Sequence, residues 1–279
     1  MITLINIELY KIFKKWRSYI GFIAIAILIP VIEIAIDMEG TRSLNFVTRQ
    51  IQQTFIFVGN LLNTYFVSYL ILNSLAIHIP FLITLVAGDL LAGEATAGTY
   101  RILVTRPISR FQLVTSKFIA GFIYTFLLIL WLAVISLGLG YFLFGTGELI
   151  VLKSGMIIVL THNDIFWRFI LAYCFAVLSM GVVASLALLF SSLVENAIGP
   201  IISTMAVIIV FIILSAINID VFQSVKPFLF TTYMNTWSSF FDKPMDTAEI
   251  MKSVLVLTSH IVVFYGLALF IFKKKDILT

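Results

Sequence analysis

The stretch that decides the fold is FIAGFIYTFLLILWLAVISLGLGYFLF, residues 118–144, which contains no Asp, Glu, Lys, Arg or His. A helix needs about 20 predominantly apolar residues to cross the hydrocarbon core of a bilayer. This segment is long enough to cross it with tilt, or to extend beyond it. It therefore predicts a transmembrane helix.

Five further segments are also long and predominantly apolar. They are residues 18–36, 64–87, 167–190, 198–217 and 251–272. The segment at 64–87 is the least uniform because it contains Asn73, His78 and Pro80, but its 13 Leu, Ile, Val and Phe residues favour insertion. We expect an all-α integral membrane protein with six transmembrane helices, folded as a single transmembrane domain over residues 1–279.

The composition of the whole chain supports this class. Hydrophobic residues make up 61% of the sequence, charged residues make up 11%, and the mean hydropathy is +1.10. An ordinary soluble domain is about 45–50% apolar and about 25% charged. A soluble enzyme, a disordered chain, a coiled coil and a disulfide scaffold are all poor interpretations. The only cysteine, Cys174, excludes an intramolecular disulfide and a Cys-rich metal site, and we expect no metal on this chain.

The distribution of charge predicts the orientation. Six spans place both termini on one side, and that side would hold 11 of the 18 basic residues with 5 of the 14 acidic ones. The net charge is then +6 on the terminal side and −2 on the other. Because basic residues favour the cytoplasmic side, we expect cytoplasmic N- and C-termini in a multi-pass protein of the inner (plasma) membrane. The first apolar segment starts late and lacks a cleavage site, so we expect it to remain as a membrane helix.

Residues 1–17 predict a different kind of membrane element. Apolar side chains recur there at helical spacing, and the lysines fall mostly on the opposite face. This pattern is typical of an amphipathic helix in the membrane interface, with its lysines on anionic lipid. A simple basic anchor is the alternative interpretation.

A shorter apolar stretch, residues 149–160, is interrupted by Lys153 and Gly155. It is too short to span a bilayer. We expect an interfacial or re-entrant piece or a small packed external element, and an ordinary loop remains the alternative.

The connection over residues 88–117 is the longest predicted cytoplasmic loop between spans and carries the most charge. Its pattern predicts a short helix from Asp89 to about Val104, with acidic residues in its first turns. Pro107 would end this region, and Ser109 can cap a new helix that continues into the next span. The result would be two helices joined by a turn and continuous with two membrane helices.

This connection also carries a recognisable motif. The residues are Glu94-x-x-x-Gly98-Thr99-x-Arg101-x-Leu103-x-x-x-Pro107-Ile108-Ser109-Arg110, followed by Lys117. The motif and the pattern of six spans resemble the permease subunits of type-2 ATP-binding-cassette (ABC) export transporters. The segment from Lys226 to Trp237 and the basic C-terminus also resemble that family.

The resemblance implies a coupling helix within residues 88–117 that docks on a separate ATPase. Glu94, Gly98, Thr99 and Arg101 would lie at or near the docking surface, while Pro107 and Arg110 would belong to the turn back to the membrane. Ordinary helix capping and helix breaking are the alternative roles for these residues.

The resemblance also implies the partners. Two nucleotide-binding ATPase subunits, with their ATP and magnesium, would serve two permease copies or this chain and a related permease. The chain has no Gly-Lys dipeptide and hence no P-loop, so we expect it not to be an enzyme and to carry no cofactor. Membrane lipids are expected partners, and nucleic acid is not.

Two other functions remain open at this stage: an ion-gradient-driven secondary transporter and an intramembrane enzyme. His78 and His260 fall near the centres of their predicted spans, where polar groups are functional candidates. They could line a transport path, act in catalysis, or simply bond a neighbouring helix. Glu33 and Asp89 are expected near span ends, within reach of water.

Overall fold

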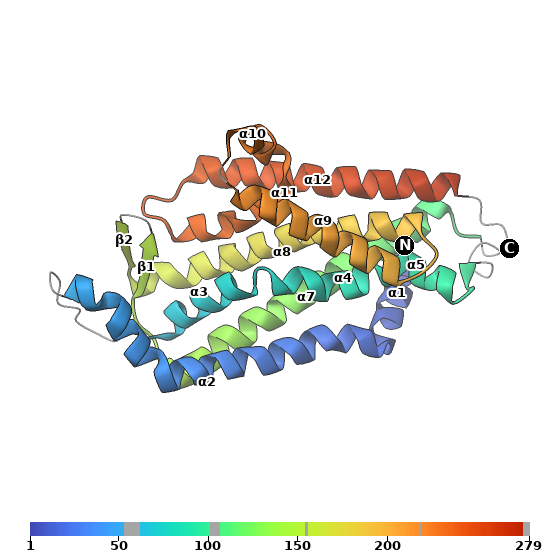
Figure 1. Ribbon diagram of the computed structural model, residues 1–279. Helices are drawn as coiled ribbons and strands as arrows, with labels where there is room; N and C mark the ends of the chain where they lie inside the picture. Colours follow the sequence, from blue (N-terminus) through green and yellow to red (C-terminus); the bar gives the residue numbers. More distant parts are fainter. Residues whose placement is uncertain (53–61, 101–106, 154–155, 218, 276–279) are drawn as a thin grey trace.

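The computed structural model describes residues 1–279 except 53–61, 101–106, 154–155, 218 and 276–279 (Figure 1). Within the described residues, five helices are long and apolar enough to cross a membrane, or up to six if one bent helix pair counts as a span. The protein is an all-α membrane protein with one small β-hairpin in the described part of the chain.

The elements follow one another in this order along the chain. They are α1 (Ile2–Lys14), α2 (Trp16–Gln52), α3 (Thr64–Leu75), α4 (His78–Ala87), α5 (Asp89–Thr96), α7 (Arg110–Phe144), β1 (Leu149–Lys153), β2 (Met156–Leu160), α8 (His162–Leu193), α9 (Ile198–Ala216), α10 (Asp220–Gln223), the 3-10 helix η1 (Lys226–Phe228), α11 (Phe230–Met234), the 3-10 helix η2 (Asn235–Phe241) and α12 (Thr247–Lys274). Single helices at five of the six predicted spans confirm those apolar segments, although α2 continues well beyond residue 36 and α7 begins before residue 118.

The long helices run side by side along one axis of the molecule (Figure 1). Met1, α5 and the end of α12 lie at one end of the bundle, and the β-hairpin lies at the other. Helix α8 is central, since 67% of its most apolar window is buried compared with 11% for α12. Small residues permit this close packing: a Cβ atom at Gly181 would lie 2.6 Å from the Phe122 ring of α7.

The predicted second span is two helices rather than one. Helices α3 and α4 meet at a break of 58°, so the expectation of one continuous helix over residues 64–87 is wrong. Pro80 explains the break, because it has no backbone N–H to donate to the carbonyl of Ala76 and its ring clashes with that carbonyl in a straight helix. The bend lies at residues 76 and 77, between the two helices.

Residues 149–160 form the antiparallel hairpin of β1 and β2, with Leu149 opposite Leu160 and Val151 opposite Ile158. These four side chains are buried, whereas Ile157 and Val159 point outward. The alternation is that of a strand pair with one covered face. The stretch is therefore the small packed external element that was one of the expectations, and it is not a loop.

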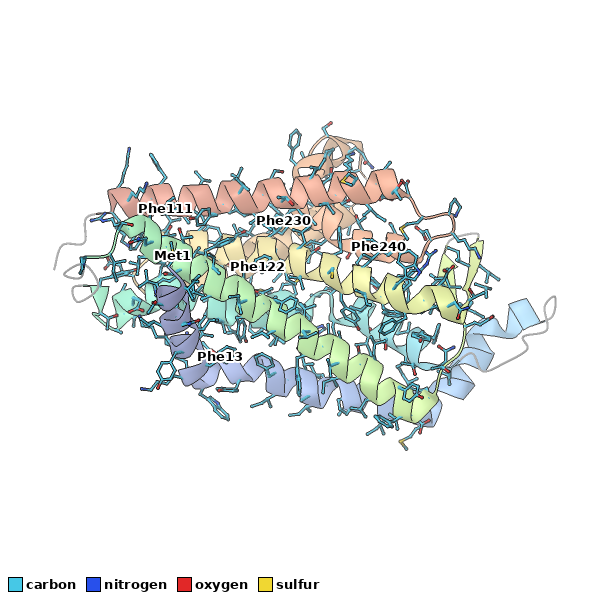
Figure 2. The ribbon with its side chains drawn as sticks, turned by 180° about the vertical axis from the view of Figure 1, so that it is seen from behind. Met1, Phe13, Phe111, Phe122, Phe230 and Phe240 are labelled. Atoms are coloured by element: carbon cyan, nitrogen blue, oxygen red, sulfur yellow. The ribbon has the colours of Figure 1, made fainter. Side chains whose placement is uncertain are left out.

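The outer surface of the bundle is apolar along its length. Figure 2 shows side chains projecting all along the helices, with labelled phenylalanines from Phe111 near one end to Phe240 toward the other. Large exposed apolar side chains occupy the outer faces of three helices: Ile27 and Val31 on α2, Ile202 and Ile213 on α9, and Leu255 and Val262 on α12. Contiguous apolar surface of this kind indicates contact with lipid rather than water.

Candidate functional site

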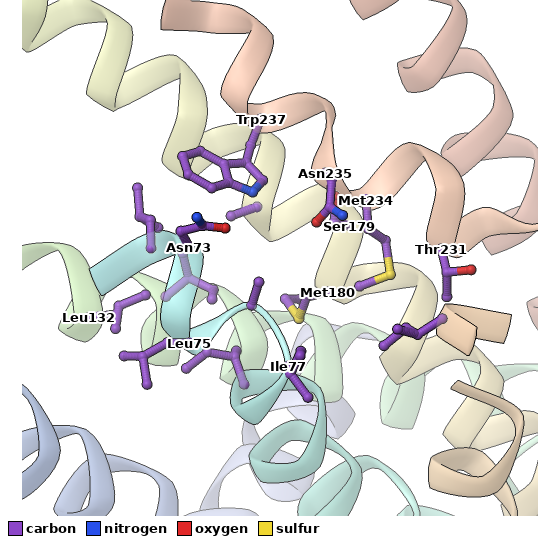
Figure 3. Close-up of a pocket in the computed structure, with 16 residues that line it drawn as sticks. Asn73, Leu75, Ile77, Leu132, Ser179, Met180, Thr231, Met234, Asn235 and Trp237 are labelled. Atoms are coloured by element: carbon purple, nitrogen blue, oxygen red, sulfur yellow. The ribbon is translucent and has the colours of Figure 1, made fainter. Parts of the chain in front are cut away.

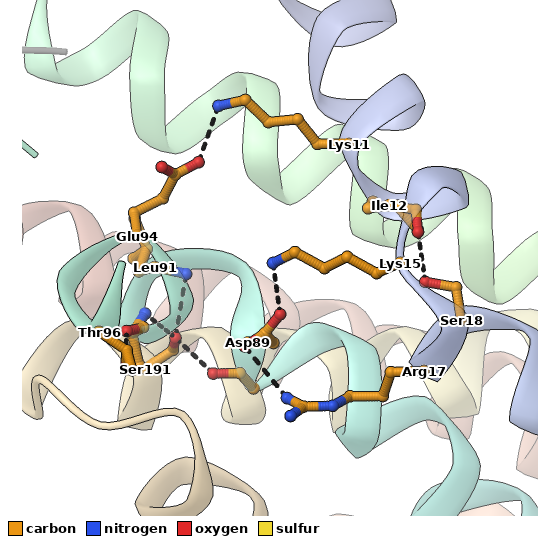
Figure 4. Close-up of polar contacts among 12 residues, drawn as sticks. Lys11, Ile12, Lys15, Arg17, Ser18, Asp89, Leu91, Glu94, Thr96 and Ser191 are labelled. Carbon is orange, nitrogen blue, oxygen red and sulfur yellow. Dashed lines mark hydrogen bonds and ion pairs between the residues drawn. The ribbon is translucent and has the colours of Figure 1, made fainter. Parts of the chain in front are cut away.

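Helix α5 is held at its N-terminus by a serine of another helix. The Oγ atom of Ser191, on α8, accepts hydrogen bonds from the backbone N–H groups of Leu91 (3.1 Å) and Ala92 (2.8 Å), and donates one to the carbonyl of Gly88 (2.7 Å) (Figure 4). The first N–H groups of a helix have no partners within it, and a side chain commonly supplies them. Here that side chain comes from α8, so the start of α5 is fixed to the bundle.

Four charged residues tie α5 to two other helices. Lys117 of α7 donates to Glu8 of α1 (2.6 Å) and to Glu94 of α5 (3.0 Å). Lys11 of α1 donates to Glu94 (2.7 Å) and to Glu8 (3.0 Å). We call these four residues the ion-pair cluster. Its two positive and two negative charges alternate, so each charge has two opposite partners.

The ion-pair cluster is largely shielded from solvent. The side chain of Lys117 is 1% exposed and that of Glu94 is 12% exposed. Burial alone would raise the pKa of Glu94, but the charge of Lys117 and the hydrogen bonds from Lys11, Thr99 and Lys117 lower this pKa to about 2. Burial alone would lower the pKa of Lys11, and its pairing with Glu94 and Glu8 raises that pKa overall. Both groups are therefore charged at neutral pH.

A second pair of contacts fixes the first residue of α5. Asp89 accepts hydrogen bonds from Lys15 (2.6 Å) and from Arg17 (3.1 Å), which flank the junction of α1 and α2 (Figure 4). The carboxylate also lies in the first turn of α5, where the helix dipole favours negative charge. Asp89 is 9% exposed, and its carboxylate is held by these two ion pairs with the partly exposed side chains of Lys15 and Arg17.

The other end of α5 is an exposed tip. The helix ends at Thr96, and Gly98 has a φ of +65°, a left-handed conformation that interrupts the helix. The expected helix from Asp89 to about Val104 is therefore too long. Thr96, Ala97 and Gly98 are exposed, and we call them the α5 tip. Just after it, the hydroxyl of Thr99 bonds to the carbonyl and carboxylate of Glu94.

The residues named by the sequence motif have different roles in the structure. Glu94 faces the interior of the protein, while Gly98 and Pro107 are exposed. Arg110 donates from Nη1 to the carbonyls of Phe272 (3.1 Å), Lys273 (2.7 Å) and Lys275 (2.7 Å), so it caps the end of α12. Arg101 lies outside the described residues.

The predicted cap at Ser109 is confirmed. Its Oγ accepts a hydrogen bond from the N–H of Gln112, and the Gln112 side chain accepts one from the N–H of Ser109. This reciprocal capping box starts α7 at Arg110. Helix α7 thus runs without interruption from the connection into its membrane segment.

The two histidines each bond to backbone carbonyls. His78 is exposed at the start of α4, with Nδ1 3.1 Å from the carbonyl of Ser74. His260 is half-buried on α12, with Nδ1 2.8 Å from the carbonyl of Val256 and Nε2 3.3 Å from that of Phe228. His260 therefore bonds to a neighbouring element, η1, whereas His78 contacts the carbonyl four residues before it. A place on a transport path stays a prediction for both.

The structure buries Glu33, which was expected from the sequence to lie within reach of water. Glu33 of α2 is 0% exposed, and neither carboxylate oxygen has a hydrogen-bond partner among the described residues. The expectation that water reaches it is wrong, because packing between helices covers it, and Gly140 of α7 lies close to its carboxylate. Its position near the end of an apolar segment gave no signal of this burial, which depends on packing between helices.

The fold and the site define a multi-pass α-helical membrane protein whose short helix α5 is fixed by ion pairs and hydrogen bonds to α1, α7 and α8. The sequence matches, over residues 19–278, the family described as "Protein of unknown function (DUF2705)", and the chain belongs to that family.

A curated relative is the "Uncharacterized protein YhcI" of Bacillus subtilis (strain 168). It is 28% identical over 206 residues, which are 69% of this chain and 63% of the relative. The chain therefore spans less than two thirds of the length of that relative.

Proposed function

We propose that the chain is the permease subunit of an ABC transporter, of the exporting kind, and that α5 is its coupling helix. The observation that carries the proposal is the attachment of α5: it is bonded to α1, α7 and α8, yet its tip is exposed. An element that receives force from a soluble partner needs this combination of an accessible end and a rigid connection to the membrane helices.

The attachment gives a mechanical route for the coupling. A displacement of α5 would act on α7 through Lys117 and on α8 through Ser191, because both contacts are short and buried. It would also act directly on α4, because a single residue, Gly88, separates the end of α4 from the start of α5. Helices that are linked by such contacts can move together as a rigid body, whereas a flexible linker would absorb the displacement.

The orientation follows from the same proposal. Met1, α5 and the end of α12 share one end of the bundle, which is compatible with the sequence expectation that both termini lie on the same side of the membrane (Figure 1). We propose that this end faces the cytoplasm of a cell bounded by an inner (plasma) membrane, with α1 in its lipid interface. Two nucleotide-binding ATPase subunits and a second permease, identical or related, would complete the transporter, and ATP and magnesium would bind the ATPases.

The experiment is an affinity purification of the tagged chain from its own cell in mild detergent. Identification of a P-loop ATPase in stoichiometric amount, with ATP hydrolysis in the purified complex, supports the proposal. Ala97→Trp at the α5 tip should release the ATPase, while Val159→Trp, an equally large substitution on the exposed face of the hairpin, should not. Active ion-driven transport by the purified chain alone would contradict it.

Glu33 favours a second candidate, an ion-gradient-driven secondary transporter. Its carboxylate is buried and has no hydrogen-bond partner in the part of the chain that the structure describes, and ionisable groups buried in a membrane helix are functional candidates. This candidate predicts that Glu33→Gln abolishes ion-dependent uptake into liposomes containing only this chain, with no added ATPase. An absence of such uptake by the wild-type chain would exclude it.

A further inference from the structure

A cavity of about 190 Å³ opens at the bend between α3 and α4. It is surrounded by α3, α4, α7, α8, α9, α11 and η2, and Figure 3 shows its lining side chains. Leu75, Ile77 and Leu132 form part of its apolar wall, and Trp237 lies near Asn73 on another side. The cavity lies beside residues 76 and 77, where the bend separates α3 from α4.

The wall includes a fully buried hydroxyl, that of Ser179. Ser179 of α8 is 1% exposed, and its Oγ has no hydrogen bond among the described residues although it lines the cavity. A buried hydroxyl without a partner is unfavourable by about 1–3 kcal/mol, so such groups are normally satisfied. Ser185, two turns further along the same helix, bonds instead to the carbonyl of Val182 (2.8 Å). Ser179 is thus available to a ligand.

The lining determines the charge of that ligand. None of the 16 residues around the cavity is Asp, Glu, Lys, Arg or His. A charged group there would be buried without a counter-ion, which is strongly unfavourable. Asn73 and Asn235 are the exposed polar members, so the cavity opens beside neutral amides.

The volume determines the size. An apolar cavity of roughly 150 Å³ holds a benzene molecule, and drug-sized ligands need roughly 300–1,000 Å³. We propose that this cavity is a binding site for a small neutral molecule, or the end of a longer one, that has an apolar body and a hydroxyl group bonded to Ser179. This site does not rest on the proposed transporter function, because it is formed within a single chain.

The probe is a six-carbon alcohol carrying a photoreactive diazirine, applied to the full-length protein in lipid nanodiscs. Labelled residues are located by peptide mass spectrometry. We expect label on the cavity-facing part of α8, on Met180 or its neighbours. Excess 1-hexanol should suppress this label, whereas hexanoate, of the same length but charged, should not.

Matched variants test the role of the hydroxyl. Ser179→Ala should reduce labelling about three- to tenfold, the loss expected for one hydrogen bond, while Ser185→Ala should leave it unchanged. Ala176→Phe should fill the cavity and abolish labelling. If that variant does not fold, the comparison of Ser179→Ala with Ser185→Ala tests the proposal without it. Equal labelling of Ser179→Ala and Ser185→Ala, or equal competition by hexanol and hexanoate, would overturn the proposal.

Discussion

The Nζ atom of Lys117 lies 3.0 Å from Oε1 of Glu94, and this buried ion pair joins α7 to α5. The two residues are 23 positions apart, near the start and at the end of the connection over residues 88–117. The pair closes that connection into a loop with a rigid base. The α5 tip is an exposed part of this loop.

Removing the central cation should destabilise the protein. Lys117→Met leaves Glu8 and Glu94 with Lys11 as their shared partner, and we expect a loss of about 3 kcal/mol in the free energy of unfolding, at the lower end for breaking a buried pair. Chemical denaturation in detergent measures it. Lys14→Met, which removes an exposed lysine at the end of α1, should change stability by less than about 0.5 kcal/mol. Equal effects of the two substitutions would show that the ion pairs of Lys117 contribute no more to the free energy of unfolding than an exposed lysine does.

The ion-pair cluster should make the protein sensitive to acid. The pKa of Glu94 falls from about 4.5 to about 2 on folding. A carboxyl group with a lowered pKa contributes stability that is fully present above its unfolded pKa and is lost as the pH falls toward its folded pKa. Between pH 6 and pH 3 the wild-type protein should lose more stability than Glu94→Gln, as measured by denaturation in detergent at each pH. Parallel losses in both proteins would contradict the assignment.

Arg110 should hold the end of α12 in place. It donates to three carbonyls there, and Arg110→Gln should leave them without this partner and fray the last turn. Hydrogen exchange of residues 270–275 should become faster by about tenfold, corresponding to roughly 1.4 kcal/mol for lost bonds to a charged donor. Lys274→Gln removes an exposed charge from the same turn and serves as the control, for which we expect no such change.

Asn63, at the start of α3, should stabilise its helix more than the exposed Asn196, at the start of α9, stabilises its own. It is 0% exposed, its Oδ1 accepts from the N–H groups of Tyr65 and Phe66, and its Nδ2 donates to the carbonyl of Glu148 beside the hairpin. Asn63→Ala should lower the free energy of unfolding by about 2 kcal/mol. Asn196→Ala removes a similar but exposed cap, and its cost should be smaller, about 0.5–1 kcal/mol. The reverse order would be evidence against the hairpin contact.

The sequence was sufficient to predict the helices because membrane spans are defined by length and hydropathy alone. It was also sufficient for the cap at Ser109, because a capping box is local. The bend at Pro80 was not predicted, although the proline itself was the signal. In membrane helices many prolines are tolerated, as Pro30 is within α2, so the residue alone does not fix the outcome.

The contacts of the site depended on tertiary structure. Glu94, Lys117 and Arg110 were selected for their place in a motif, but no local rule pairs Glu94 with Lys11 at a separation of 83 residues, or Arg110 with the end of α12. For the same reason the sequence did not indicate that Glu33 and Ser179 are buried with no hydrogen-bond partner for their side-chain oxygens among the residues that the structure describes. Their partners, or the absence of partners, are decided by neighbouring helices that are distant in sequence.

The most direct test of the proposed coupling is site-specific cross-linking at the α5 tip. In a Cys174→Ser background, Ala97→Cys and Val159→Cys place single thiols at opposite ends of the bundle for a short thiol-to-amine cross-linker. We predict a covalent adduct between residue 97 and a co-purified P-loop ATPase, and none from residue 159. An ATPase that cross-links equally to both positions, or a functional complex with no ATPase adduct at residue 97, would contradict the proposal.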